Sequence, residues 1–219
     1  ARSGDWWPGA YQSTVDANIV YLNVTTYNIL KSDGSARHST YMSMDKQEVR
    51  QALAQTIADT QSDIIGFGEL DQTNLPRGAN DLAELCSSIN DYTWSLDWPN
   101  AISKSGWLNP TYSTSCDYSD GFAYNNKKLE VVESGYVWLS KTKEKWYEDA
   151  KSAYDNVGNP ERTCIWIKFR HKNTGKMFWV FVTHLPTESQ GGQENIAKVV
   201  NRFAQSKAGN EPSILLGDM

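Results

Sequence analysis

Alternating apolar and polar positions predict strands near the beginning of the chain. The segment Ile19–Ile29 alternates and is rich in Val, Thr and Tyr, which suit a pleated surface. A short apolar run, Asp63–Phe67, predicts a second strand. Between them, Val49, Leu53 and Ile57 recur every four positions and predict one apolar face of a helix that begins near residue 45. Strand, helix and strand in this order indicate an α/β unit.

The rest of the chain continues this pattern. A helix is predicted at Asn80–Ile89, and Ile196, Val199, Val200 and Phe203 predict a later one by their helical spacing. The turn Lys172–Gly175 predicts a hairpin. Further strands are predicted at Tyr92–Leu96, Phe122–Tyr124, Leu129–Leu139, Thr163–Phe169, Met177–Val182 and Ser213–Leu216. The run Phe178–Val182 is apolar at every position, which predicts a central strand covered on both faces.

Composition narrows the protein class. The 219 residues make one large domain or two small ones, and 39% hydrophobic with 12% aromatic residues excludes disorder as the main state. No run of apolar residues is long enough to span a membrane as a helix. The net charge of −5 argues against a broad basic surface for nucleic acid or anionic membrane. This net charge does not exclude a local cationic groove.

The cysteines and the start of the sequence give information about the cellular compartment of the protein. The sequence has three cysteines, Cys86, Cys116 and Cys164, which allow one disulfide at most, and it does not indicate which two would pair. It contains no C-x-x-C motif, so neither a zinc ribbon nor a thioredoxin site is expected. The chain starts at Ala1 and is rich in Trp and Tyr with few charged residues. We therefore expect an exported protein, periplasmic or extracellular.

Polar side chains stand where apolar strands end, and these are the candidate chemical groups. Asn28, Glu69, His184 and Asp218 each close or follow a predicted strand. In α/β sheets, ligands collect outside the carboxyl ends of strands. Amide and carboxylate oxygens are hard ligands, which favour Mg²⁺, Mn²⁺ or Ca²⁺ over zinc. Such an ion polarises a phosphoryl oxygen, a carboxylate can orient water, and a His can bind or protonate phosphate oxygen.

Each of these residues also has a purely structural interpretation. Asn28 could form a turn, and Glu69 could pair with a neighbouring cation. His184 could hydrogen-bond a backbone carbonyl, and Asp218 could be solvated. The pattern alone therefore suggests a site without establishing one.

Several short segments together resemble the endonuclease/exonuclease/phosphatase family. The matching segments are Thr26–Leu30, Asp63–Glu69, Glu133–Ser140, Glu161–Cys164, Val182–Leu185 and Leu215–Met219. Each is short, but their order and spacing are fairly specific. The resemblance implies an α/β fold, a four-layered sandwich of two mixed β-sheets packed face to face with helices outside.

The resemblance also implies residue roles. Asn28 and Glu69 would bind the divalent ion, with Glu69 the dominant ligand, and His184 would lie near the scissile phosphate. Asp218 would orient the attacking water, and Arg162 would face substrate phosphate, which suits its planar bidentate geometry. Asp120, just before the strand predicted at Phe122–Tyr124, is a further candidate acid that would lie behind the residues in contact with the substrate. Arg162 also has a structural interpretation, as a charged residue on the surface that keeps the protein soluble.

One departure from the family pattern concerns the end of the sequence. The family motif continues after Gly-Asp-x with Asn and ends much later in an Asp-His pair, whereas this sequence stops at Met219. We expect residues 1–17 to form an irregular lead-in and 18–219 to form a domain incomplete at its C-terminus. We therefore expect this chain to be nearly inactive until the following segment is supplied, in cis or as a second fragment. A missing strand would leave an exposed sheet edge.

The first functional hypothesis is a Mg²⁺-dependent phosphoesterase that cleaves a P–O bond by direct water attack. The substrate could be nucleic acid, a lipid headgroup, or a sugar or inositol phosphate, and the acidic balance favours a small substrate slightly. The second hypothesis is a non-catalytic member of the same fold that binds carbohydrate or another ligand. It rests on an aromatic-rich region formed by Trp94, Trp98, Trp107, Tyr112 and Tyr118, although loop packing explains such residues more simply.

Overall fold

The computed structural model describes seven stretches of the chain, residues 19–28, 47–68, 94–97, 121–139, 145–148, 162–185 and 190–219. Within them lie two helices, α1 (Gln47–Asp59) and α5 (Gln190–Ala208). The strands are β1 (Val24–Asn28), β2 (Ile64–Gly68), β3 (Trp94–Asp97), β4 (Gly121–Asn125), β5 (Leu129–Leu139), β6 (Trp146–Tyr147), β7 (Arg162–His171), β8 (Met177–His184) and β9 (Ser213–Asp218).

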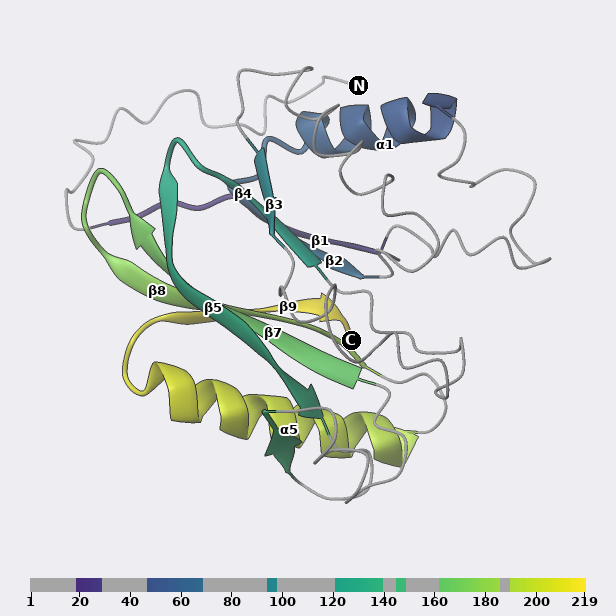
Figure 1. Ribbon diagram of the computed structural model, residues 1–219, viewed down its shortest axis with the longest axis vertical. Helices are drawn as coiled ribbons and strands as arrows, with labels where there is room; N and C mark the ends of the chain where they lie inside the picture. Colours follow the sequence, from purple (N-terminus) through teal and green to yellow (C-terminus); the bar gives the residue numbers. More distant parts are fainter. Residues whose placement is uncertain are drawn as a thin grey trace, which may run out of the picture.

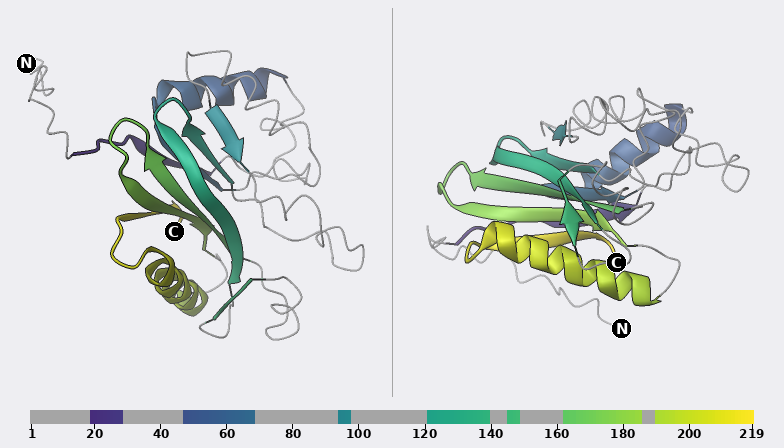
Figure 2. Two further views of the ribbon diagram at one scale, coloured as in Figure 1. Left: turned by 60° about the vertical axis from the view of Figure 1, so that its left-hand side comes forward. Right: turned by 60° about the horizontal axis from the view of Figure 1, so that its bottom comes forward.

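The strands form two mixed sheets. One has the order β1-β2-β4-β3, with β1 and β2 parallel and the other pairs antiparallel. The other has the order β6-β5-β7-β8-β9, with only β8 and β9 parallel. Figure 1 shows α1 on the outer side of the first sheet and α5 on the outer side of the second, and the views of Figure 2 agree. The described part of the chain is therefore a four-layered α/β sandwich, which confirms the predicted fold class.

The central strand β8 shows why the sequence builds this arrangement. Phe178, Val180 and Val182 point into the core between the two sheets, while Trp179 and Phe181 point toward α5. Because successive side chains of a strand face opposite sides, a strand covered on both sides must be apolar throughout. The prediction of a central strand from its continuous apolar run is confirmed.

Helix α5 covers the outer face of the second sheet with one apolar stripe. Ile196, Val199, Val200 and Phe203 are fully or almost fully buried against that sheet. The ring of Phe203 makes an edge contact with Phe181, their centroids lying 6.0 Å apart. The helical spacing read from the sequence therefore marks the face that packs.

The two sheets approach closely near Gly66 on β2. A Cβ atom on Gly66 would lie 3.0 Å from Leu216 Cβ and 3.2 Å from Val182 Cγ1, tighter than side chains normally pack. The missing side chain lets β2 sit against β8 and β9. This contact brings the ends of strands from both sheets to one place.

Two hairpins lie at the other end of the sandwich. One joins β4 to β5 through residues 126–128, and the other joins β7 to β8 through residues 172–176. Gly175 closes the second turn with φ +70°, a conformation that favours glycine. The hairpin predicted at this position is confirmed, and Figure 1 shows both tips on the same side of the molecule.

The predicted element boundaries differ from the structure in a few places. The strand predicted over Ile19–Ile29 begins only at Val24, one residue after Asn23. Its side-chain amide donates to the carbonyls of Thr60 and Gln61, and its backbone N–H donates to Asp63 Oδ2 at 3.0 Å. The sequence pattern from Thr142 to Tyr154 favours neither a helix nor a strand, and the structure places the short strand β6 within it. The predicted helix Asn80–Ile89 lies outside the described residues.

Two further features bear on the predictions. No helix in the described ranges is long and apolar enough to cross a membrane. Cys164 is buried, whereas Cys86 and Cys116 lie outside the described residues.

Candidate functional site

Four strands from both sheets end at one place. Asn28 ends β1 in register with Gly68 at the end of β2, and His184 ends β8 in register with Asp218 at the end of β9. Each pair is parallel, so both members leave the sheet in the same direction. The alternation along each strand places all four on the face that looks toward the opposite sheet.

Asp218 connects the two sheets at this point. Asn28 Nδ2 donates a hydrogen bond to Asp218 Oδ2 at 2.9 Å. The same oxygen lies 3.7 Å from His184 Nε2, an ion pair when the imidazole is protonated. The structure therefore brings three of the four strand-end candidates together, namely Asn28, His184 and Asp218, while Glu69 lies outside the described residues. Their chemical roles are a separate matter and stay predictions.

Burial differs sharply between these groups. The side chain of His184 is 7% exposed, whereas that of Asp218 is 49% exposed. A buried imidazole thus lies beside a carboxylate that water can reach, which is not the arrangement of a sealed core network.

Gly217 fixes the position of Asp218. Its φ is +147°, and a Cβ atom there would lie only 1.7 Å from the carbonyl oxygen of Thr183. Only glycine fits, so the backbone of β9 can run this close to β8 and then present the Asp218 carboxylate next to His184. The adjacent N–H of Leu185 donates to the Asp218 carbonyl at 2.9 Å and continues the contact between the two strands past His184.

Gly68 leaves room between the two sheets. A Cβ atom on Gly68 would lie 3.8 Å from Asn28 Cβ and from His184 Nδ1, which is ordinary contact. The space between the amide of Asn28 and the imidazole of His184 is therefore bounded by a residue without a side chain. The sequence analysis did not predict that Gly68 leaves this space or that Gly217 lets β9 approach β8. The signal in the sequence is a glycine directly before each predicted acid, Glu69 and Asp218.

Arg162 does not join this cluster. It begins β7 and pairs with Leu139, whose side chain packs toward α5. Cross-strand partners share a face, so Arg162 lies on the α5 side of the sheet and His184 lies on the other. The Arg162 side chain is buried, and its Nε and Nη1 atoms have no hydrogen-bond partner within the described ranges. A buried guanidinium favours an anionic partner, and its role toward phosphate stays a prediction.

Two predicted site residues lie outside the described ranges. Glu69 follows Gly68 directly in the sequence, and Asp120 precedes Gly121 at the start of β4. Both residues are therefore direct sequence neighbours of described strands, and their roles stay predictions.

The donor set fits a hard divalent ion only in part. Asn28 contributes an amide oxygen and Asp218 a solvent-accessible carboxylate, both suited to Mg²⁺. Within the described stretches, no group of three His, Cys, Asp or Glu side chains is placed to hold a metal. A complete metal site thus needs a further ligand, and Glu69 is the residue that the sequence offers next to Gly68.

Similarity to known proteins is found at the level of structure. No protein-family model and no curated protein sequence matches the chain. The endonuclease/exonuclease/phosphatase protein from Bacteroides vulgatus superposes with a TM-score of 0.63 at 20% identity, covering 90% of this chain and 65% of that one. The mannosyl-6-phosphatase of Bacteroides thetaiotaomicron gives 0.62 at 21% identity with the same coverage.

A human structure shares the same arrangement. The catalytic domain of human Nocturnin, solved with a bound sulfate anion, gives a TM-score of 0.55 at 18% identity, with 89% of this chain and 62% of that chain covered. The chain spans about two thirds or less of the length of these structures. It has the fold of the endonuclease/exonuclease/phosphatase proteins, so the fold implied by the sequence resemblance is confirmed.

Proposed function

We propose that this protein is a divalent-metal-dependent phosphoesterase that hydrolyses a phosphate ester by direct attack of water. The observation that carries the proposal is the convergence of Asn28, His184 and Asp218 from both sheets, joined through Asp218 Oδ2. The fold supports it, because structures that share this fold include an enzyme named as a phosphatase.

Each residue of the candidate site would have a role that suits its chemical type. Glu69 and Asn28 would hold the ion, which would polarise a phosphoryl oxygen and stabilise the leaving oxygen. The open carboxylate of Asp218 would accept a hydrogen bond from the attacking water and orient it toward phosphorus. His184, when protonated, would donate to a non-bridging phosphate oxygen and favour the negative charge that develops there.

Asn28 has a second role in this scheme. Its Nδ2 donates to Asp218 Oδ2, so it fixes the carboxylate rotamer and leaves the amide oxygen directed elsewhere. One amide can thus orient the carboxylate and offer an oxygen to a cation. We expect the Asn28→Asp variant to lose the orientation of Asp218 but to keep an oxygen ligand for the cation, because a carboxylate cannot donate to Asp218 yet still binds a hard ion.

The substrate class follows from charge and from the relatives. A chain of net charge −5 favours a small phosphate ester over a nucleic acid, whose binding needs many cations near the site. A sugar phosphate is the first choice for a test, in line with the mannosyl-6-phosphatase among the structural neighbours. We also propose that activity requires the segment that the longer relatives carry beyond the part matched here.

The test is hydrolysis with and without Mg²⁺ by the chain extended past Met219. The substrates are bis-p-nitrophenyl phosphate, p-nitrophenyl phosphate and mannose 6-phosphate, and the comparison is Glu69→Ala. Metal-dependent turnover that the variant lacks supports the proposal, and the preferred ester separates nuclease-like from phosphatase-like chemistry. A folded extended chain that cleaves none of the three contradicts it.

A further inference from the structure

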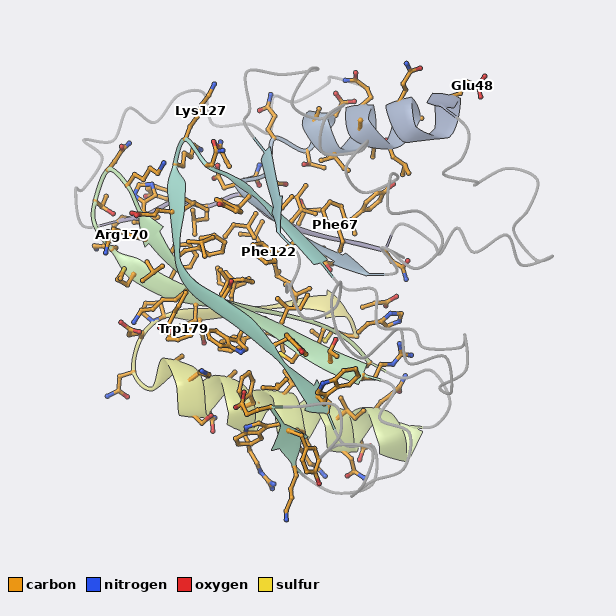
Figure 3. The ribbon with its side chains drawn as sticks, viewed as in Figure 1. Glu48, Phe67, Phe122, Lys127, Arg170 and Trp179 are labelled. Carbon is orange, nitrogen blue, oxygen red and sulfur yellow. The ribbon has the colours of Figure 1, made fainter. Side chains whose placement is uncertain are left out.

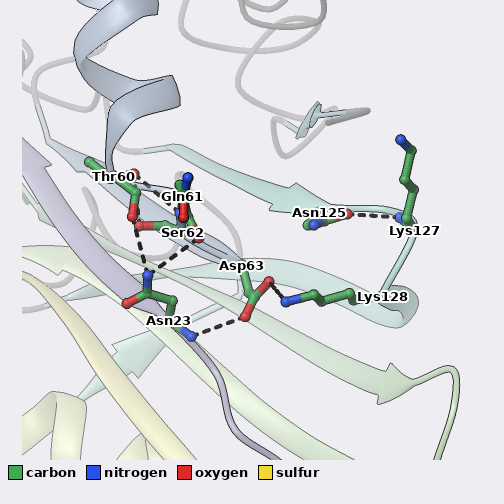
Figure 4. A network of polar contacts seen from close by, with 8 residues as sticks. All are labelled: Asn23, Thr60, Gln61, Ser62, Asp63, Asn125, Lys127 and Lys128. Carbon is green, nitrogen blue, oxygen red and sulfur yellow. Dashed lines mark hydrogen bonds and ion pairs between the residues drawn. The ribbon is translucent and has the colours of Figure 1, made fainter. Parts of the chain in front are cut away.

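The buried hydroxyl groups of this protein differ in one respect. Three hydroxyl side chains are buried in the part of the chain that the structure describes: Ser62, Thr163 and Thr183. Ser62 Oγ donates to Thr60 Oγ1 at 2.9 Å, as Figure 4 shows, and Thr183 Oγ1 donates to the Thr163 carbonyl at 2.8 Å. Thr163 Oγ1, in contrast, has no hydrogen-bond partner among these residues. A buried hydroxyl without a partner costs stability, so its presence calls for a function.

The side chain of Thr163 lies on the face of the second sheet that carries the candidate site. Along β7, Cys164 packs toward α5, and Ile165 packs between the two sheets. Figure 3 labels one side chain in each of these layers, Trp179 beside α5 and Phe122 between the sheets. Because successive side chains of a strand face opposite sides, Thr163 shares the face of Ile165.

The neighbour of Thr163 on β8 is His184. Cys164 is in register with Thr183 in the antiparallel pair of β7 and β8, so the next position places Thr163 opposite His184. On its other side, His184 is in register with Asp218 of β9. The imidazole therefore stands between a hydroxyl on one flank and a carboxylate on the other. Its Nε2 atom lies 3.7 Å from Asp218 Oδ2, which is longer than a hydrogen bond.

We propose that Thr163 is a positioning residue that orients His184 during catalysis, an inference that rests on the proposed function. Opposite residues on neighbouring strands have Cβ atoms about 5 Å apart, so a rotation of the side chains brings Oγ1 within reach of a ring nitrogen. In the proposed hydrolysis, one ring nitrogen of His184 would hydrogen-bond to Thr163 Oγ1 while the other donates to phosphate. The ring would then be held from the β7 side, and the Asp218 carboxylate would be available to orient water.

The first test replaces each buried threonine hydroxyl by a methyl group of similar shape. In urea unfolding of the 219-residue chain, Thr163→Val should raise the midpoint, because it removes an unpartnered polar atom. The matched control Thr183→Val should lower the midpoint, because it removes the hydrogen bond to the Thr163 carbonyl. In the extended chain, Thr163→Val should lower kcat at least about 10-fold with little change in KM, because it disturbs orientation in the transition state. Thr183→Val should keep kcat, and Thr163→Ser, which retains the hydroxyl, should keep most of it.

A second measurement follows the contact without any hydrolysis. The imidazole nitrogen NMR signals of His184 are recorded in the 219-residue chain with Mg²⁺ and inorganic phosphate added. A hydrogen bond to the ring changes the signal of the nitrogen that makes it, so we expect Thr163→Val to shift the His184 signals from their wild-type positions. Thr163→Ser and Thr183→Val should leave them near those positions.

The outcomes separate a positioning role from a structural one. A Thr163→Val variant that is more stable but slower supports the proposal, because a purely structural residue would lose stability and activity together. A lowered urea midpoint, wild-type kcat or wild-type His184 signals in Thr163→Val would each overturn it, as would equal losses of kcat in both valine variants. An extended wild-type chain that hydrolyses no ester contradicts the proposed function instead, and the His184 signals then decide whether the contact with Thr163 exists.

Discussion

The two ends of the sandwich are built from the same strands but have different chemistry. At one end, the parallel pairs β1/β2 and β8/β9 finish together, and polar side chains from both sheets meet. At the other end, two antiparallel hairpins close through short turns, and lysines point outward. Parallel strands cannot be joined by tight turns, so their ends are left for longer connections and for side chains that bind.

Two histidines show what this difference means for a side chain. His171, at the end of β7, has Nδ1 2.9 Å from the hydroxyl of Thr174 in the adjoining turn. His184, at the end of β8, is buried and faces a carboxylate from another strand. The first imidazole is satisfied locally, whereas the second depends on groups assembled by the tertiary fold. The candidate site lies at the second end, where Asn28 from one sheet meets His184 and Asp218 from the other.

The largest expected effect is the loss of the fold at the site end through Gly217→Ala. A Cβ atom would meet the Thr183 carbonyl at 1.7 Å, and φ of +147° disfavours any side chain. We expect destabilisation of at least about 3 kcal/mol in urea unfolding. The control Gly209→Ala also has positive φ but meets nothing within 4 Å, so it should cost only about 1 kcal/mol. Equal costs would show that the tight β8–β9 contact does not matter.

The next largest expected effect is a loss of catalysis that leaves the fold intact. Asp218→Asn in the extended chain should lower kcat by about 100-fold or more, because the amide orients water poorly. Stability should change little, since the Asp218 side chain is half exposed. The exposed acid Glu194 in α5 supplies the control Glu194→Gln, which should keep full activity. A variant that retains wild-type kcat would remove Asp218 from the mechanism.

At the end where the two hairpins close, substitutions should change stability and leave hydrolysis alone. Asp63 is 2% exposed, pairs with Lys128 and accepts from the Asn23 backbone. Asp63→Ala should therefore cost about 2 kcal/mol of unfolding free energy. The matched variant Glu130→Ala breaks the exposed pair with Arg170 and should cost about 0.5 kcal/mol. A large loss of kcat/KM in folded Asp63→Ala would contradict the separation of the two ends.

The smallest expected effect is a pH dependence from Glu211. Hydrogen bonds from Lys168 and, secondarily, from Trp179 Nε1 hold the pKa of this carboxyl below its ordinary range. Its stabilising contribution is therefore fully present above the ordinary glutamate pKa of about 4.3. That contribution is lost as pH falls through the lowered pKa of the folded state. The stability gap between wild type and Glu211→Gln should narrow as urea unfolding is repeated at decreasing pH, and a constant gap would contradict this assignment.

The sequence predicts the strands and the late helix well because their signals are local. The continuous apolar run of β8 and the i, i+3, i+4, i+7 spacing in α5 depend only on which faces become buried. Strand β1 was predicted too long, since it begins one residue after Asn23, which hydrogen-bonds to residues about 40 positions away. Such a contact depends on the tertiary structure and leaves no pattern in the neighbouring residues.

The candidate site could be predicted in composition but not in geometry. Polar residues at strand ends identified Asn28, His184 and Asp218, and their convergence follows once the parallel pairing is known. The placement of Arg162 on the α5 face depends on its register with Leu139, which the sequence does not specify. The close approach at Gly217 likewise arises from the β8–β9 pairing. Registers and contacts between sheets are properties of the assembled fold.

The measurement that tests the central claim most directly compares the two histidines in one spectrum. Paramagnetic Mn²⁺ is added in small amounts to the 219-residue chain, and the imidazole NMR signals of His184 and His171 are followed, with His184→Gln and His171→Gln to assign them. We predict that the His184 signals broaden first and that excess Mg²⁺ restores them, while the His171 signals stay sharp. Broadening of His171 before His184, or of both equally, would contradict a divalent-ion site at the strand ends.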